Sequence, residues 1–155
     1  MYQVLIVDDE PIVKIALRSM IDWESLGFHI CATASNGEEA LEMAERFHPD
    51  LMICDLKMPV MDGIDLIKAA KDKKMDCEFL VISNYEDFNY VRTALVLGAS
   101  DYILKVSISP EELTSQLQKV KTKLEDKQAK KEPEDSVETS FLHQEGHAAW
   151  WEFFT

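Results

Sequence analysis

Several features that would assign the chain to other protein classes are absent or scarce. Its 155 residues include five glycines, five prolines and three cysteines, Cys31, Cys54 and Cys77. The cysteines are odd in number and lack metal-ligand spacing, so we expect buried, reduced thiols rather than disulfides or zinc ligands. No apolar run is long enough to cross a bilayer, and a predicted strand, not a signal peptide, begins the sequence. These absences favour a cytoplasmic protein with no membrane segment.

Positive charge is also scarce. Lysine and arginine number 16 against 29 aspartates and glutamates, which gives a net charge of −13. Residues 1–126 and residues 127–155 are each net negative, so neither part should bind nucleic acid through its own field. The hydrophobic fraction of 46% is enough for one core. We predict one domain over residues 1–126, followed over 127–155 by a linker or the start of an output region.

Strand and helix patterns alternate along the first domain. Five apolar segments are predicted strands: Tyr2–Val7, Phe28–Ala34, Leu51–Asp55, Glu78–Ser83 and Asp101–Lys105. Helical patterns follow them from near Pro11, after Asn36, over Ile64–Ala70, over Asp87–Leu97, and from Ser109 to about Lys130. We expect Asp8 or Asp9 to cap the first helix and Pro133 to end the last one. Short apolar strands between helices predict an α/β fold with a doubly wound, five-stranded parallel sheet.

Polar side chains stand at the ends of four predicted strands. Asp8 and Asp9 follow the first strand, Asp55 ends the third, Ser83 ends the fourth and Lys105 ends the fifth. Ligands of open parallel sheets bind at the carboxyl ends of the strands. Three carboxylates that converge there repel one another unless a cation lies among them. This pattern predicts a divalent metal site beside a carboxylate that can take up a phosphoryl group.

These motifs resemble the receiver domain of two-component response regulators. The resemblance covers about residues 1–125 and rests on Val7-Asp8-Asp9-Glu10, on Asp55 with Met58-Pro59-Val60-Met61-Asp62-Gly63, on Ser83, on Gly98-Ala99 and on Asp101-Tyr102-Ile103-Leu104-Lys105. The segments 21–28 and 83–88 more particularly resemble receivers attached to AraC-type helix-turn-helix transcription regulators. The resemblance implies a flavodoxin-like (βα)5 fold with strand order 2-1-3-4-5.

The resemblance also implies a role for each strand-end residue. Asp55 would accept a phosphoryl group from a sensor histidine kinase, and Lys105 would pair first with the acceptor carboxylate and then with the phosphoryl oxygens. Mg²⁺ would be the cofactor. Its protein ligands would be Asp9 and Asp55 directly, Asp8 through water, and the backbone carbonyl of Lys57.

A conformational switch is implied as well. Ser83 would hydrogen-bond a phosphoryl oxygen, and Tyr102 would then change rotamer. The surface of the fourth helix, fifth strand and fifth helix would respond, and a homodimer could form through it. DNA would be bound only through a C-terminal domain absent from this chain. Such a domain is not a turnover enzyme, so only self-phosphorylation from a phosphodonor and slow self-dephosphorylation are expected.

Two departures from the family pattern lead to further expectations. Val106 stands where the family usually has a proline after a cis bond, and a cis bond to valine costs about 2.5–4 kcal/mol. We therefore expect the loop Val106–Ser109 to be either trans and rearranged or strained. Lys57 and Tyr85 would border the path of the attacking water, so we predict slow self-hydrolysis that becomes faster in Tyr85→Ala.

Other classes remain as alternatives. A free-standing receiver with an adhesive tail is one, although we favour a fragment whose DNA-binding part is missing. A Mg²⁺-dependent phosphatase would need an Asp-x-Asp pair after the first strand, which Asp8-Asp9-Glu10 lacks. A nucleotide- or flavin-binding module would need a glycine-rich loop there. A pseudo-receiver that only binds proteins would not need the full acidic set.

Overall fold

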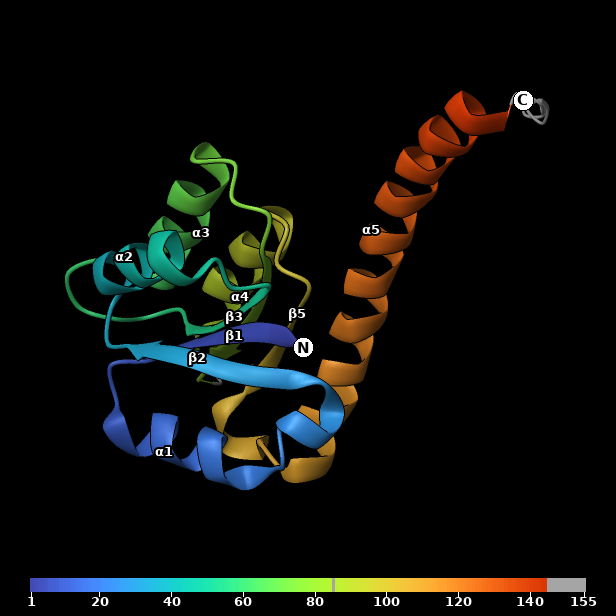
Figure 1. Cartoon of the computed structure of the whole chain (residues 1–155). Coiled ribbons are helices and arrows are strands. Elements are labelled where there is room, and N and C mark those ends of the chain that lie inside the picture. The colour runs from blue at the N-terminus through green and yellow to red at the C-terminus, as the bar shows by residue number, and fades with distance from the viewer. Residues whose placement is uncertain (85, 145–155) are drawn as a thin grey trace. The chain divides into compact units, whose positions relative to one another are not determined.

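The five predicted strands form one parallel sheet. The computed structural model describes residues 1–84 and 86–144, and its first compact unit comprises Met1–Val120. The strands are β1 (Tyr2–Val7), β2 (Phe28–Ala34), β3 (Leu51–Asp55), β4 (Glu78–Ser83) and β5 (Asp101–Leu104). Their order, β2-β1-β3-β4-β5, confirms the doubly wound, flavodoxin-like fold (Figure 1). Only β5 differs from its predicted bounds, and it ends one residue earlier.

Helices cover both faces of this sheet. They are α1 (Pro11–Met20), α2 (Gly37–Phe47), α3 (Gly63–Asp72), α4 (Phe88–Val96) and α5 (Pro110–Gln144), with 3₁₀ turns η1 (Glu24–Leu26) and η2 (Lys105–Ser107). Figure 1 shows α2 and α3 on one face and α1 on the other. Among the described residues, no helix combines the length and the apolar character that a membrane span requires.

Alternation along the strands divides the core into two layers. Leu5, Met52 and Cys54 are fully buried in the layer that includes Leu66 and Ile67 of α3. Val4, Ile6 and Ile53 point to the opposite face because successive strand side chains alternate, and they are also fully buried. Near this second layer, the indole of Trp23 donates to the carbonyl of Leu17 at 3.0 Å. Burial on both faces explains why these strands read as nearly continuous apolar runs.

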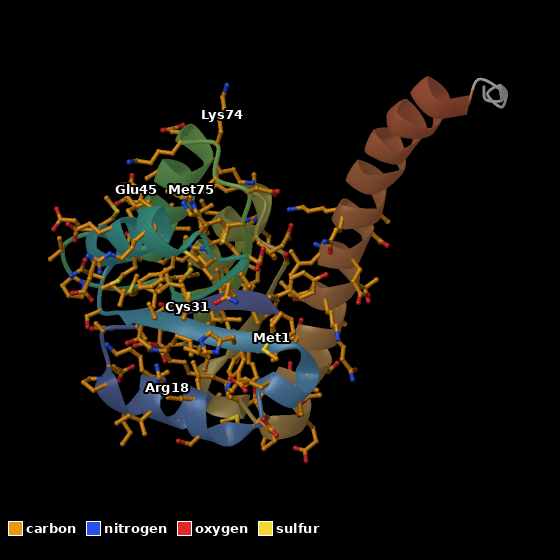
Figure 2. The ribbon with its side chains drawn as sticks, in the orientation of Figure 1. Met1, Arg18, Cys31, Glu45, Lys74 and Met75 are labelled. Atoms are coloured by element: carbon orange, nitrogen blue, oxygen red, sulfur yellow. The ribbon has the colours of Figure 1, made fainter. Side chains whose placement is uncertain are left out.

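Among the described residues the three cysteines form no disulfide, but only Cys54 is fully buried. Cys31 lies on β2 (Figure 2), where the pairing register with β1 shifts between Val4 and Leu5. Cys77 precedes β4 in a loop. Both are half-buried, so the expectation of burial was wrong for these two. An edge strand and a loop each leave part of a side chain open to solvent.

The predicted cap of α1 was also wrong. Glu10 occupies the N-cap position, and its side chain makes no capping hydrogen bond. The backbone N–H of Glu10 instead donates to Oδ1 of Asp8 at 2.8 Å, so this carboxylate folds back on its own loop. Pro11 at the first helical position lacks an N–H, which leaves fewer donors to satisfy. Asn36, by contrast, caps α2 by accepting from the N–H of Glu39 at 2.9 Å.

The last helix begins as predicted and ends later than predicted. The hydroxyl of Ser109 accepts from the N–H of Glu112 at 3.1 Å, as an N-cap should. Pro133 does not end the helix, which continues to Gln144. A proline removes only one helical hydrogen bond, and the residues before it, Lys127-Gln128-Ala129-Lys130-Lys131-Glu132, have high helix propensity.

Candidate functional site

The acidic residues predicted from the strand ends come together at one edge of the sheet. Asp8 and Asp9 follow β1, and Asp55 is the last residue of β3, which pairs directly with β1. One carboxylate oxygen from each of the three lies within 4.8 Å of the other two. Asp8 and Asp55 are buried, whereas Asp9 is exposed. The chain therefore concentrates three negative charges in a space suited to one cation.

Lys105 supplies positive charge beside this cluster. Its Nζ lies 2.9 Å from Oδ2 of Asp55, 3.3 Å from Oδ2 of Asp8 and 2.6 Å from Oε1 of Glu10. Burial lowers the pKa of Lys105, but the hydrogen bonds to Glu10 and Asp55 and the neighbouring charges raise it by more. The ammonium therefore stays charged and partly neutralises the carboxylates.

The backbone after Lys105 departs from the family pattern without a cis bond. All peptide bonds between described residues are trans, including the one to Val106, and residues 105–107 form η2. The loop is thus trans and rearranged, as the first of our two expectations stated. Val106 itself is 80% exposed.

Burial makes two of these residues, Asp8 and Asp55, costly to ionise. It raises the pKa of Asp8 to about 6, and the nearby Asp55 contributes, while the N–H of Glu10 and Lys105 act in the opposite direction. Burial likewise raises the pKa of Asp55 above its usual value, and Lys105 opposes that shift. Oδ2 of Asp8 is buried and makes no regular hydrogen bond among the described residues, although Nζ of Lys105 lies 3.3 Å away. Buried carboxylate oxygens that share one ammonium are suited to a hard cation such as Mg²⁺, which prefers oxygen ligands.

Ser83 and Tyr102 lie on the adjacent strands β4 and β5. The Ser83 side chain is fully buried, and its hydroxyl has no hydrogen-bond partner among the described residues. Tyr102 is 40% exposed and lines a groove of about 360 Å³ with Phe88, Val91 and Leu95 of α4. A free buried hydroxyl and an exposed aromatic ring beside a groove are two groups that could each adopt a second arrangement.

Two contacts of the site were not predicted from the sequence. Glu10 contacts Lys105, and its place directly after Asp8-Asp9 is the signal in the sequence that points to this contact. The side chain of Lys57 forms an ion pair with Asp87, 3.0 Å from Oδ1, whereas we had considered only its backbone carbonyl and the water path. Residues so far apart in sequence gave no signal of this pairing. Tyr85, the other residue expected on that path, lies outside the described residues.

Comparison with known proteins identifies the family. The response regulator receiver domain family matches residues 4–118. The transcriptional regulatory protein YesN of Bacillus subtilis is 36% identical over 120 residues, which are 77% of this chain and 32% of that protein. The transcriptional regulatory protein HptR of Staphylococcus aureus is 35% identical over 105 residues, 68% of this chain and 41% of that protein. This chain thus spans less than half the length of these relatives.

Solved structures agree with this assignment. The receiver domain of AraT, a response regulator from Geobacillus stearothermophilus, has a TM-score of 0.77 and 42% identity, over 82% of this chain and 98% of that one. A two-component transcriptional regulator AraC from Clostridium phytofermentans has a TM-score of 0.76 and 31% identity, over 83% and 99% of the two chains. Sequence match, fold and the acidic edge of the sheet agree: the chain belongs to the response regulator receiver domain family.

Proposed function

We propose that this domain accepts a phosphoryl group on Asp55 from a sensor histidine kinase and thereby controls an attached transcription regulator. The contact between Nζ of Lys105 and Oδ2 of Asp55, beside the clustered oxygens of Asp8 and Asp9, carries the proposal. This arrangement brings an acceptor carboxylate, a lysine ammonium and a set of metal ligands together at the carboxyl ends of the strands. Phosphoryl transfer needs mainly positioning and positive charge of this kind.

In the proposed transfer, an oxygen of Asp55 attacks the phosphorus of the donor phosphohistidine. The new O–P bond forms as the N–P bond breaks, and the electron pair of that bond stays on the imidazole nitrogen. Lys105 is already 2.9 Å from the acceptor carboxylate, so its ammonium is placed to pair with oxygens of the transferred group. The hydroxyl of Ser83, which lacks a partner among the described residues, would donate to another of those oxygens.

The donor set fits Mg²⁺, which would be held by Asp9 and Asp55, by Asp8 through water and by the backbone carbonyl of Lys57. When bound, the ion would neutralise charge on the phosphoryl oxygens. The observations in support are the three clustered carboxylates and the buried Oδ2 of Asp8, whose charged neighbour is the ammonium of Lys105 at 3.3 Å. The four carboxylates of Asp8, Asp9, Asp55 and Glu10 outnumber the single ammonium of Lys105. The site therefore keeps a net negative charge, which favours binding of a divalent cation.

The proposed output is a change in the surface formed by α4, β5 and the start of α5. Movement of Ser83 toward a phosphorylated Asp55 would open space that Tyr102 could enter. Phe88 and Leu95 are exposed to 70% and 39%, so α4 already presents apolar area beside Tyr102. We propose that a second copy of this chain can dimerise through this surface. A DNA-binding region following the domain, as the names of its relatives suggest, would then act in the cytoplasm.

Incubation with Mg²⁺ and acetyl phosphate tests the proposal. We expect the intact mass of the wild type to increase by one phosphoryl group, and that of Asp55→Asn to stay unchanged. Chelation of Mg²⁺ should abolish the increase. A control with Asp72→Asn, an exposed residue near the end of α3, should gain the same mass as the wild type. Equal labelling of the wild type and Asp55→Asn would refute Asp55 as the acceptor.

A further inference from the structure

We propose that the ion pair between Lys57 and Asp87 holds Asn84, the residue after Ser83, in the position that it has here, and that Ser83 can close onto a phosphorylated Asp55 only when this ion pair breaks. Lys57 and Asp87 would then be positioning residues that set how readily the domain switches. The inference rests on the proposed function, since it concerns the response to phosphorylation of the same site.

Asp87 is an unusual residue for its place in the fold. It stands directly before α4, where an aspartate normally caps the helix, but its side chain makes no capping hydrogen bond. The residue is only 1% exposed. A buried carboxylate requires compensation by charge or by hydrogen bonds, because desolvation of an unpaired charge is costly. Asp87 must therefore be held by groups outside its own helix.

Two different loops provide that compensation. From the β3–α3 loop, Nζ of Lys57 lies 3.0 Å from Oδ1 of Asp87. From the β4–α4 loop, the N–H of Asn84 donates to Oδ2 of Asp87 at 3.2 Å. One carboxylate thus connects the loop that follows Asp55 with the residue that follows Ser83.

The side chain of Lys57 is well placed for this contact. Its ammonium also lies over the ring of Tyr90 on α4, 5.1 Å from the ring centroid, which adds a cation–π contact to the same helix. Its backbone N–H lies 3.4 Å from Oδ1 of Asp55. Lys57 therefore contacts the proposed acceptor through its backbone and the first turn of α4 through its side chain.

This geometry indicates that the ion pair opposes the movement of Ser83 toward Asp55. Ser83 and Asn84 are consecutive, so a shift of the Ser83 hydroxyl toward Asp55 also shifts the N–H that Asp87 accepts. Asp87 cannot follow freely while Lys57 holds its other oxygen. Loss of the ion pair should therefore make switching easier rather than harder.

Binding of beryllofluoride in the presence of Mg²⁺ tests this inference, because this phosphoryl analogue reports closure of the site without covalent transfer. Its affinity can be measured by ¹⁹F NMR titration on the wild type, Lys57→Met, Asp87→Asn and the double variant. Both substitutions remove charge and keep side-chain size, and Asp87→Asn retains an oxygen for Asn84. We expect each single variant to bind about fivefold more tightly than the wild type. The double variant should match the singles, because both remove one interaction.

The matched control is Lys73→Met, which breaks an exposed ion pair with Glu45 away from the site and should leave the affinity unchanged. Unchanged or weaker binding in Lys57→Met would overturn the restraint, as would additive effects in the double variant. Mere damage to the fold would weaken binding, which is opposite in sign to the expected result. Should Asp87→Asn fail to fold, Lys57→Met alone still decides the question. Failure of the wild type itself to bind beryllofluoride would instead contradict the proposed function and this inference together.

Discussion

Gly63 lies directly against the backbone of the proposed acceptor, Asp55. A Cβ atom at residue 63 would lie 2.4 Å from the carbonyl oxygen of Asp55 and 2.9 Å from Cα of Leu56. The N–H of Gly63 also donates to the carbonyl of Leu56 at 2.9 Å. Gly63, the first residue of α3, therefore packs against the end of β3 and helps to hold Asp55 in place.

We predict that Gly63→Ala lowers the free energy of unfolding by about 2 kcal/mol, because the backbone atoms that it meets cannot move aside cheaply. Phosphorylation of Asp55 should slow as well, since relief of the clash displaces the acceptor. Urea unfolding and intact-mass labelling measure the two effects. Gly98→Ala is the comparison: its φ of 110° also makes alanine unfavourable, but its nearest contact is the flexible end of Lys71. That variant should lose stability yet label normally, and slow labelling in both would contradict a local effect at Asp55.

Ionisation of Asp8 should couple stability to pH. Burial raises the pKa of this carboxyl from 3.8 to about 6, so the folded state holds the proton more tightly than the unfolded state does. A carboxyl group whose pKa is raised by folding stabilises the folded state fully at a pH below its pKa in the unfolded chain. This stabilisation is lost as the pH rises through its pKa in the folded protein. Without metal, we expect the wild type to lose on the order of 2 kcal/mol relative to Asp8→Asn between pH 3.5 and pH 7.

Thermal or urea unfolding of both proteins in a chelator, across this pH range, checks the prediction. Adding Mg²⁺ at pH 7 should stabilise the wild type more than Asp8→Asn, and this difference should shrink below pH 6 as protons compete with the ion. The exposed Asp72→Asn provides the control for loss of one surface carboxylate. A constant difference between the wild type and Asp8→Asn would show that burial does not perturb this group.

Removal of the Ser83 hydroxyl should stabilise the protein while impairing its response. The hydroxyl is buried without a hydrogen-bond partner among the described residues, and such a group costs about 1 kcal/mol or more. We expect Ser83→Ala to raise the free energy of unfolding by about 1 kcal/mol in urea titrations. The same variant should bind beryllofluoride more weakly than the wild type. Lower stability would indicate that Ser83 already has a partner.

Val60 is strained by its backbone conformation. Its φ is 70°, in the left-handed region that β-branched residues rarely adopt, and its side chain is 75% exposed. Asparagine tolerates this region better, so Val60→Asn should raise the free energy of unfolding by about 1 kcal/mol. Val96→Asn removes a similarly exposed valine from α4 and should bring no gain. Equal changes in both variants would mean that surface polarity, not backbone strain, is responsible.

Most of the fold was accessible from the sequence because its signals are local. Burial on both faces produces continuous apolar runs, so four strands have their predicted bounds. The alignment of parallel strands then places Asp8, Asp9 and Asp55 at one edge. The cap of α1 was mispredicted, since whether Asp8 points to the helix or to its own loop depends on the packing around it. The prediction that Pro133 ends the last helix was wrong, because strong helix formers surround this proline.

The contacts that refine the site depend on long-range geometry. Lys57 pairs with Asp87, and Glu10 pairs with Lys105, across large separations in sequence. The sequence does not indicate which of its many lysines pairs with which carboxylate. Only the arrangement of strand ends and loops selects these two. The domain boundary that we placed at residue 126 stays a prediction.

The two outer strands of the sheet, β2 and β5, are poorly suited to pair with a strand of another molecule. The shift in register between β1 and β2 marks an irregular ladder on one edge, and β5 on the other edge has only four residues. Irregular and short edge strands are ways in which proteins avoid continuous β pairing between molecules. In the proposed dimer, the two copies would therefore meet through helical surfaces, whose contacts form and separate without rebuilding a hydrogen-bond ladder.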